Sequence, residues 1–486
     1  MINQLRFSLI IVIAIIGRFT LLNAGFLNDL DEYLFVWIQK NDENLLKSAY
    51  WFKAVNEVQA QLPELFLRSV QYKLISWFYP DSPCQLSIHF LKWIGYFNCL
   101  VVVLQAIVFR KIVLKFFNSY ITADLLVATW LIFANTNLYC RHILPYDHSL
   151  LFWLCAIYFS LSENKNKHWI AGIFAALGLL TYWGSIPALF FFGFSVLQRY
   201  RKFELVPFVV PFFVFLFGIE VLAKVNDFSY LSFLIDYQTT IQTGNYDEGF
   251  LFPILYLTKV ENVIGILLLI LFSCSIFIIT KEKKKEDLYL FYPAIFSILF
   301  FSILVYFAHV FVWYGRVLHF VLPFILLVSY KVLKIILERN SMPYLLGIFL
   351  FITYTFQLYS WNKIQYPRNF IAENISESEN LKFEFETKVG LRLDKNPFVE
   401  ICYKSKKLKN KSKILLINAG FLVDYPSSKF LRSKQKIKIP KSYKLTKNGL
   451  HFQSHPFYQF EYNDRNGRNY FDKNRFYIKL YVSEIQ

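Results

Sequence analysis

Long apolar runs alternate with short polar stretches through the first 360 residues of the chain. A helix needs about 20 apolar residues to cross the hydrocarbon core of a membrane, and somewhat fewer inside a bundle. The pattern predicts eleven spans, although residues 149–198 fit either two full spans or three short ones. The predicted spans cover residues 7–24, 86–109, 120–140, 149–162, 169–183, 184–198, 204–223, 262–280, 288–310, 317–337 and 342–360.

The composition also indicates a membrane protein. Of the 486 residues, 56% are hydrophobic, 20% are aromatic and only 18% are charged, whereas soluble domains carry about 25% charged residues. The net charge of +18 would suggest a nucleic-acid partner in a soluble protein. Here the basic residues form short clusters between apolar runs, so we expect membrane lipids as partners and no nucleic acid.

Lysines and arginines cluster at alternate ends of the predicted spans. Such residues are retained on the cytoplasmic side of membranes. With eleven spans all the clusters fall on one side, which predicts a cytoplasmic N-terminus and an extracytoplasmic C-terminus; two spans across 149–198 would break this agreement. The clusters are Arg6; Arg110, Lys111 and Lys115; Lys165 and Lys167; Arg199, Arg201 and Lys202; Lys281 and Lys283 to Lys285; and Lys331, Lys334 and Arg339.

This organisation predicts a membrane domain, residues 1–360, and an extracytoplasmic domain, residues 361–486. The external loop 25–85 is expected to hold two surface helices, with the polar residues of the second one solvated. In the tail, short aromatic and β-branched runs alternate with Asn, Gly, Pro and Lys, which predicts a small mixed α/β domain over the mouth of the bundle. We expect a central strand at Leu415–Phe421 and a solvated loop at Lys404–Lys413.

Three carboxylates, Asp29, Asp31 and Glu32, directly follow the first predicted span. In one interpretation Asn28 caps a surface helix and the carboxylates complement the positive end of its dipole. In the other, a carboxylate at the mouth of the bundle accepts a proton from a substrate hydroxyl as a general base. The residues alone leave both interpretations open.

The loop after the third predicted span also concentrates polar side chains. Arg141 is suited to anion binding, with Asp147 as a second acidic group in the site. His142, Asp147 and His148 are able to ligate a metal, although their spacing matches no strong metal-site signature. The remaining interpretation is that this short turn only anchors the chain at the membrane interface.

Arg316 stands at the predicted external end of the tenth span, on the side that is poor in positive charge. An arginine beside an apolar bundle needs a partner. A phosphate suits the guanidinium fork, and snorkelling to lipid headgroups is the alternative. The sequence contains no Walker A, GxSxG, HExxH or paired CxxC pattern, so nucleotide-driven transport and hydrolase chemistry lack their usual support.

These segments, in this order, resemble motifs of the C-type (GT-C) glycosyltransferase superfamily, in particular bacterial enzymes similar to protein O-mannosyltransferases and to the lipid A aminoarabinose transferase. The resemblance covers about residues 5–360. It departs from the family pattern at Val317 and Leu318, where tyrosine is frequent, and at Pro63, where the family has a proline pair. The matching pieces are Asp31-Glu32, Gln61 to Leu65, Arg141 to Asp147, and Tyr314 to Pro323.

The resemblance implies a GT-C-like fold and an inverting glycosyltransferase of the hexosyl or pentosyl type. The enzyme would work on the external face of a bacterial inner membrane. Its donor would be a sugar linked to a polyprenyl phosphate, and its acceptor a hydroxyl of a lipid, a glycan or a protein. Two alternatives from other classes remain: a flippase or transporter of lipid-linked sugars, and a non-catalytic envelope assembly protein.

The resemblance also implies roles for six residues. The base would deprotonate the acceptor, and the guanidinium groups would bind the phosphate that leaves with negative charge. The roles are catalysis by Asp31 and Glu32, with Asp31 as the base; donor phosphate binding by Arg316 and Arg141; and positioning of the acceptor or of a divalent metal by Asp147 and His142.

Substitution of Asp31 tests the catalytic interpretation of the first loop. Asp31→Asn keeps the size of the side chain but removes its ability to take a proton. We expect this variant to lose sugar transfer while its expression and folding stay normal. Transfer of label from a radiolabelled polyprenyl-phosphate sugar measures the effect. Full activity of the variant would rule out Asp31 as the base.

Overall fold

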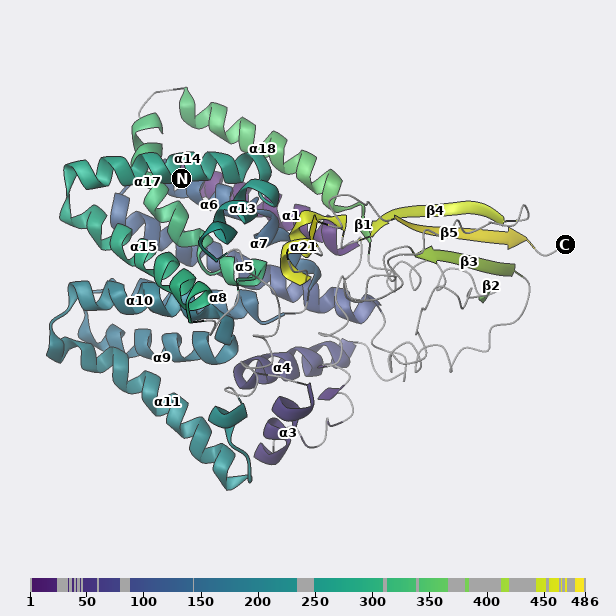
Figure 1. Ribbon diagram of the computed structural model, residues 1–486, viewed down its shortest axis with the longest axis horizontal. Coiled ribbons are helices and arrows are strands. Elements are labelled where there is room, and N and C mark those ends of the chain that lie inside the picture. Colours follow the sequence, from purple (N-terminus) through teal and green to yellow (C-terminus); the bar gives the residue numbers. More distant parts are fainter. Residues whose placement is uncertain are drawn as a thin grey trace.

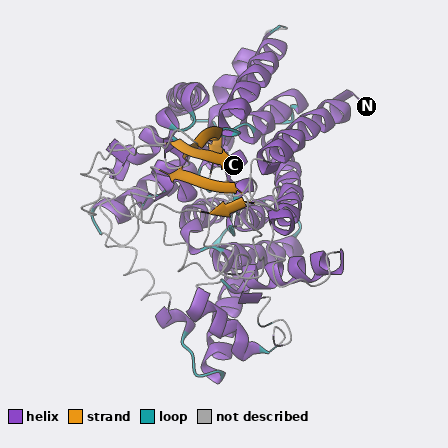
Figure 2. Cartoon of the chain, turned by 90° about the vertical axis from the view of Figure 1, so that its right-hand side faces the viewer, coloured by secondary structure: helices purple, strands orange, loops and turns teal. Residues whose placement is uncertain are grey.

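The structure of the chain is a computed structural model in which helices pack side by side in a bundle and a small sheet stands beyond one end of it (Figure 1, Figure 2). It describes residues 2–23, 34, 37–38, 41, 44, 47–58, 61–78, 88–142, 144–233, 249–308, 313–337, 341–365, 381–383, 412–418, 443–451, 454–462, 465, 468–469 and 477–484.

Each of the predicted spans overlaps a helix of the structure, and residues 146–199 form three short helices, as the three-segment interpretation predicts. Short 3-10 turns, labelled η, join several of the α-helices. The helices of the bundle are α1 (Ile2–Asn23), α3 (Ser48–Val58), α4 (Leu62–Phe78), α5 (Ile88–Phe117), α6 (Tyr120–Leu131), α7 (Ala134–Leu138), η2 (Tyr139–Arg141), α8 (Tyr146–Ser160), α9 (Lys165–Thr181), η3 (Trp183–Ser185), α10 (Ile186–Arg199), η4 (Lys202–Leu205), α11 (Val206–Val225), η5 (Gly249–Leu251), α13 (Phe252–Lys259), α14 (Asn262–Glu282), α15 (Lys285–Tyr306), α16 (Gly315–Leu318), α17 (Leu322–Leu337) and α18 (Met342–Trp361).

Helix length decides how many of these helices are candidate membrane spans. In the described part of the chain, α1, α5, α11, α14, α15 and α18 are long and apolar enough to cross a membrane. A seventh candidate is α6 together with Ala134–Arg141, joined at a bend of 62°. Helices α8, α9, α10 and α17 have 15, 17, 14 and 16 residues, which is shorter than the roughly 20 residues that a full span needs. The chain is therefore a helical multi-pass membrane protein with six or seven candidate spans, and these short helices account for the larger number predicted.

Charged and aromatic contacts join the helices at the end of the bundle opposite the sheet. Arg6 of α1 and Arg110 of α5 both pair with the buried Asp124 of α6, at 2.6 Å and 2.7 Å. At the end of α5, Phe117 stacks on Tyr330 of α17. These contacts bring the basic clusters of α1, α5 and α17 to one end of the bundle.

The described part of the tail contains one five-stranded sheet with the strand order β1-β4-β5-β3-β2. Pairs β3–β5 and β4–β5 are antiparallel, whereas β1–β4 and β2–β3 are parallel. The predicted strand Leu415–Phe421 overlaps β3, and the predicted loop Lys404–Lys413 lies outside the described residues except for its last two, which belong to β3. The strands are β1 (Ile364–Gln365), β2 (Leu381–Phe383), β3 (Ser412–Asn418), β4 (Tyr443–His451) and β5 (Tyr477–Glu484).

One helix of the tail, α21 (Pro456–Tyr462), lies within the helical body and apart from the sheet (Figure 1). Phe457 and Phe460 are buried members of the main hydrophobic core. The Phe457 ring lies 5.0 Å from that of Tyr139, and the Phe460 ring lies 5.4 Å from that of Phe252 in α13. A segment of the tail is therefore part of the core of the bundle.

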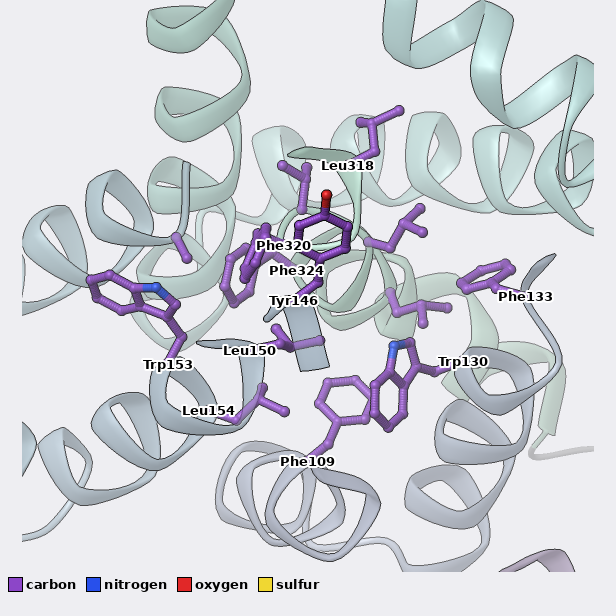
Figure 3. Packing of buried hydrophobic residues seen from close by; sticks show 14 of the residues in the cluster. Phe109, Trp130, Phe133, Tyr146, Leu150, Trp153, Leu154, Leu318, Phe320 and Phe324 are labelled. Atoms are coloured by element: carbon purple, nitrogen blue, oxygen red, sulfur yellow. The ribbon is translucent and has the colours of Figure 1, made fainter. Parts of the chain in front are cut away.

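Buried aromatic side chains form a rigid layer between α8, α10 and α17. Tyr146 lies close to Phe320 and Phe324 in this layer (Figure 3). Phe324 also stacks on Phe191 of α10, with ring centres 3.8 Å apart. Because close-packed interiors transmit strain and resist deformation, this layer fixes the relative positions of α8 and α16–α17.

The packing of the first turn of α14 against α13 requires a glycine. A Cβ at Gly265 would overlap the backbone carbonyl of Leu257, so α14 approaches α13 too closely for any side chain there. Gly218 in α11, by contrast, has open space around its Cα.

We expect Gly265→Ala to lower the melting temperature of the purified protein. The new methyl group would collide with the Leu257 backbone, which is less able to shift than a flexible side chain.

The matched control is Gly218→Ala, for which the same substitution should be neutral or stabilising by about 0.5–1 kcal/mol, since alanine favours the helix. Thermal unfolding in detergent, followed by intrinsic fluorescence, compares the two variants. Equal melting temperatures for both would show that the close approach of α13 and α14 is unimportant.

Candidate functional site

The structure brings four of the six predicted site residues to the end of the bundle that α21 enters. Asp31 and Glu32 lie outside the described residues, so the assignment of the base stays a prediction. The other four come from the segment after α7 and from α16, and each contacts α21, the end of α18 or a neighbouring buried polar group. These four residues are Arg141, His142, Asp147 and Arg316.

The carboxylate of Glu461 in α21 binds Arg316. Arg316 Nε lies 2.7 Å from Oε1, and the Arg316 backbone N–H donates to Oε2 at 2.9 Å. Tyr139 also donates its hydroxyl to Oε2 at 2.9 Å, and Arg316 Nη2 donates to the Glu461 carbonyl at 3.2 Å. Burial raises the pKa of Glu461, and the charge of Arg316 offsets part of that rise. The carboxylate thus has two hydrogen-bond donors and one ion-pair partner, from two segments of the bundle.

The surroundings of Arg316 hold its guanidinium in one place. Its centre lies 4.8 Å from the ring of Tyr314 and 5.8 Å from that of Tyr146, distances typical of cation–π contacts. A Cβ at Gly315 would come within 3.0 Å of the Tyr256 ring and 3.1 Å of Glu461 Oε2, so a side chain here would require these neighbours to shift by a few tenths of an ångström. The Arg316 side chain keeps 25% of its surface exposed, so it remains accessible to a ligand.

Arg141 has a different environment from Arg316. Its side chain is completely buried. Nη1 donates to the carbonyl of Trp361 at 3.1 Å, and Nη2 donates to that of Ile364 at 2.9 Å. The guanidinium therefore satisfies backbone carbonyls where α18 ends and β1 begins, and it ties the segment after α7 to the start of the tail.

His142 is buried between the bundle and α21. Its ring lies 5.4 Å from the ring of Tyr458 and 6.0 Å from that of Tyr139. Burial, together with the positive charges of Arg141 and Arg316, lowers the pKa of His142 to about 3. The imidazole is therefore neutral near pH 7, which suits hydrogen bonding or metal ligation better than neutralisation of a phosphate.

Asp147 begins a buried polar chain that crosses the site. Its Oδ1 lies 3.2 Å from Nε2 of His319, and Nδ1 of His319 lies 2.8 Å from Oδ1 of Asn135. The Asn135 amide donates to the Tyr256 hydroxyl at 2.8 Å and to the Gly315 carbonyl at 3.0 Å. Since that amide nitrogen is committed to these acceptors, His319 must donate from Nδ1. The chain links α8, α7 and α13 to α16.

A second buried group joins α4, which lies between α1 and α5 in the sequence, to this site. Glu64 of α4 forms an ion pair with Arg68 and lies 3.4 Å from Nδ1 of His148. Arg68 also donates to Asn98 of α5 at 2.9 Å and to the Leu144 carbonyl at 3.0 Å. We expected the polar residues of this helix to be solvated. That expectation is wrong for Glu64 and Arg68, because the bundle covers them.

Glu261 supports the site from the side of α13 and α14. Its carboxylate accepts hydrogen bonds from the backbone N–H groups of Ala134 and Asn135, at 2.7 Å and 3.1 Å. It therefore satisfies free donors at the start of α7. Burial raises the pKa of Glu261 to about 7, and these two hydrogen bonds limit the rise.

The predicted metal ligands can be compared with the geometry. Among the described residues, no group of three or more His, Cys, Asp or Glu side chains is arranged to hold a metal ion. Asp147 is near His319, whereas His148 faces Glu64. The three side chains of the loop after α7 that were predicted as metal ligands, His142, Asp147 and His148, thus lie beside different neighbours.

Two residues that form central contacts of the site, Glu461 and His319, were not predicted as site residues from the sequence. Glu461 lies in an aromatic run of the tail, where Pro456 signals a helix start but nothing signals a partner. His319 follows Arg316 by three residues, a spacing that places both near one face of a short helix. That spacing was the signal that could have identified His319.

No protein-family model, curated protein or solved structure matches the chain.

The pairing of Arg316 with Glu461 predicts the stability of three variants. Arg316→Gln and Glu461→Gln each leave one charge without its partner in a largely buried site, so each should destabilise the protein, on the order of 2 kcal/mol. The double variant removes both charges and should be more stable than either single variant. Thermal unfolding of all three in one detergent measures this. Additive losses in the double variant would mean that the two side chains do not interact.

Proposed function

We propose that the chain is a membrane glycosyltransferase that uses a polyprenyl-phosphate-linked sugar on the external face of the membrane. One observation carries the proposal: three of the four segments that resemble family motifs meet in space. Glu64 contacts His148, Asp147 contacts His319, and Tyr139 and Arg316 share the Glu461 carboxylate. Residues far apart in sequence that form one buried polar group in a membrane protein favour a functional site.

The proposed orientation has eleven spans, with the N-terminus in the cytoplasm and the tail outside. Short helices such as α8 and α10 then act as spans inside the bundle. Basic clusters gather at one end, where Arg6 and Arg110 flank Asp124, and the polar site lies at the other end, near the sheet. This arrangement favours an external active site that a lipid donor reaches from within the membrane.

In the proposed reaction the acceptor oxygen forms a bond to the anomeric carbon of the sugar, and the bond from that carbon to the phosphate oxygen breaks. Asp31 takes the hydroxyl proton as general base, and Glu32 assists it. Negative charge develops on the departing phosphate, where a fixed cation lowers the barrier. Attack opposite the leaving group inverts the configuration of the sugar.

We assign contact with the phosphate to Arg316, because its guanidinium is held in place and is partly exposed. Arg141 is fully buried on backbone carbonyls, so we propose that it supplies positive charge and rigidity beside the phosphate. Asp147 and His142 would position the acceptor, or a divalent metal if one takes part. Glu461 orients Arg316 and is thereby a positioning residue.

A transfer assay with matched variants tests the proposal. Purified protein in lipid nanodiscs receives a radiolabelled polyprenyl-phosphate sugar and a membrane extract as acceptor. We expect Arg316→Gln to lower transfer by about 10²–10³-fold, the effect of losing one donor to a developing charge. The double variant Arg316→Gln/Glu461→Gln should regain stability but not transfer.

Two outcomes would contradict the proposal. If the double variant regained full transfer, Arg316 would serve only to neutralise Glu461 and would not bind the phosphate. If the label stayed on the lipid with the unmodified protein under every acceptor tested, the chain would be a transporter or an assembly protein.

A further inference from the structure

Four cations gather at the end of the bundle opposite the candidate site. Lys111 and Lys115 lie near the end of α5, Lys167 lies in the first turn of α9, and Arg199 is the last residue of α10. Lys167 and Arg199 are close enough to Lys115 for their positive charges to act on it. We call these four residues the basic end cluster.

Aromatic rings hold members of this cluster in place. The Arg199 guanidinium lies 5.1 Å from the ring centres of both Phe116 and Tyr289. The Lys115 ammonium lies 4.4 Å from the ring of Tyr158 and donates to the Tyr158 carbonyl at 3.2 Å. The cations are therefore positioned by α5, α8 and α15 and do not move freely in water.

Carboxylates do not neutralise the basic end cluster. In the described part of the chain, none of the four forms an ion pair with an acidic side chain, unlike Arg110 and Lys331 at the same end. The nearby Glu204 instead accepts the backbone N–H of Arg201 at 3.0 Å. Arg199 Nε is buried without a hydrogen-bond acceptor, although buried polar atoms are normally satisfied.

The local electrostatics favour an added anion. Like charges in a partly buried place repel one another unless a counter-ion lies between them. The first turn of α9 contains no acidic residue, so the positive end of its helix dipole adds to the charge of Lys167.

We propose that the basic end cluster binds the phosphate headgroup of an anionic membrane phospholipid. The four residues of the cluster lie where apolar helices end, at the depth of the lipid headgroups. Tyr158 and Tyr289 lie beside them, and tyrosine is typical of the membrane–water interface. Basic sites between membrane helices on the cytoplasmic side bind such headgroups through charge. This lipid would join the ends of α5, α9 and α10 and is distinct from the donor of the proposed reaction.

Lipid titration with matched variants tests this site. Delipidated full-length protein in detergent is titrated with phosphatidylglycerol or with phosphatidylcholine, and native mass spectrometry counts the bound lipids. We expect Lys115→Gln/Arg199→Gln to weaken the binding of phosphatidylglycerol at least about tenfold, since each basic residue near such a headgroup contributes substantially. Lys281→Gln/Lys283→Gln removes the same charge from two exposed lysines and should change the binding little.

Three results would overturn the proposal. Equal weakening in both double variants would indicate diffuse attraction and no defined site. Equal binding of phosphatidylcholine would show that headgroup charge is irrelevant. If inorganic phosphate at millimolar concentration displaced the lipid completely, the site would take a soluble anion and not a lipid.

A second measurement covers the case in which the cluster variant fails to fold. Unmodified protein in native membranes is exposed to a photoactivatable phosphatidylglycerol, and the labelled peptides are identified. We expect label in peptides that contain residues 111–117 and 199–205. Label that is confined to other peptides would contradict the proposed site.

Discussion

The buried carboxylate of Glu461 is the constraint on which the end of the bundle near the sheet depends. A carboxylate leaves water only when donors replace its hydration. Here the donors are the Tyr139 hydroxyl and the backbone N–H of Arg316, and the Arg316 guanidinium adds an ion pair. These donors belong to segments far apart in the sequence, so one side chain of the tail fixes their relative positions. Arg141 reinforces this arrangement where α18 ends. The tail is thus part of the site.

The membrane imposes a different chemistry on each end of the bundle. Between the ends, apolar and aromatic packing is sufficient to hold the helices together, because backbone groups inside a helix form their hydrogen bonds within that helix. At one end the cations divide into those paired with carboxylates, such as Arg110 with Asp124, and the basic end cluster, which forms no ion pair with a carboxylate in the described part of the chain. At the other end, charges and histidines such as Asp147 and His319 are buried in pairs. This asymmetry favours the proposal of an external site at one end and a bound lipid at the other.

Much of the architecture could be predicted from the sequence, because apolar runs and basic clusters are local signals. The helix positions follow from them, whereas the proximity of the segment after α7 to Arg316 was expected only from the resemblance to glycosyltransferases. The count of eleven spans stays a prediction, since hydropathy does not distinguish a short helix inside a bundle from a full span. The docking of α21 could not be predicted either: its contacts are long-range, and an acid such as Glu461 in an aromatic run gives no hint of its partner. Burial of Glu64 was missed for the same reason.

The most direct test of the account is an experimental structure of the full chain with a bound polyprenyl monophosphate. The account predicts that the phosphate contacts the Arg316 guanidinium, while α21 stays docked and Glu461 keeps its hydrogen bond to Tyr139. Arg141 should remain on the carbonyls of α18 and β1, beside the phosphate but not on it. A phosphate bound away from Arg316, or at the opposite end of the bundle only, would contradict the central claim.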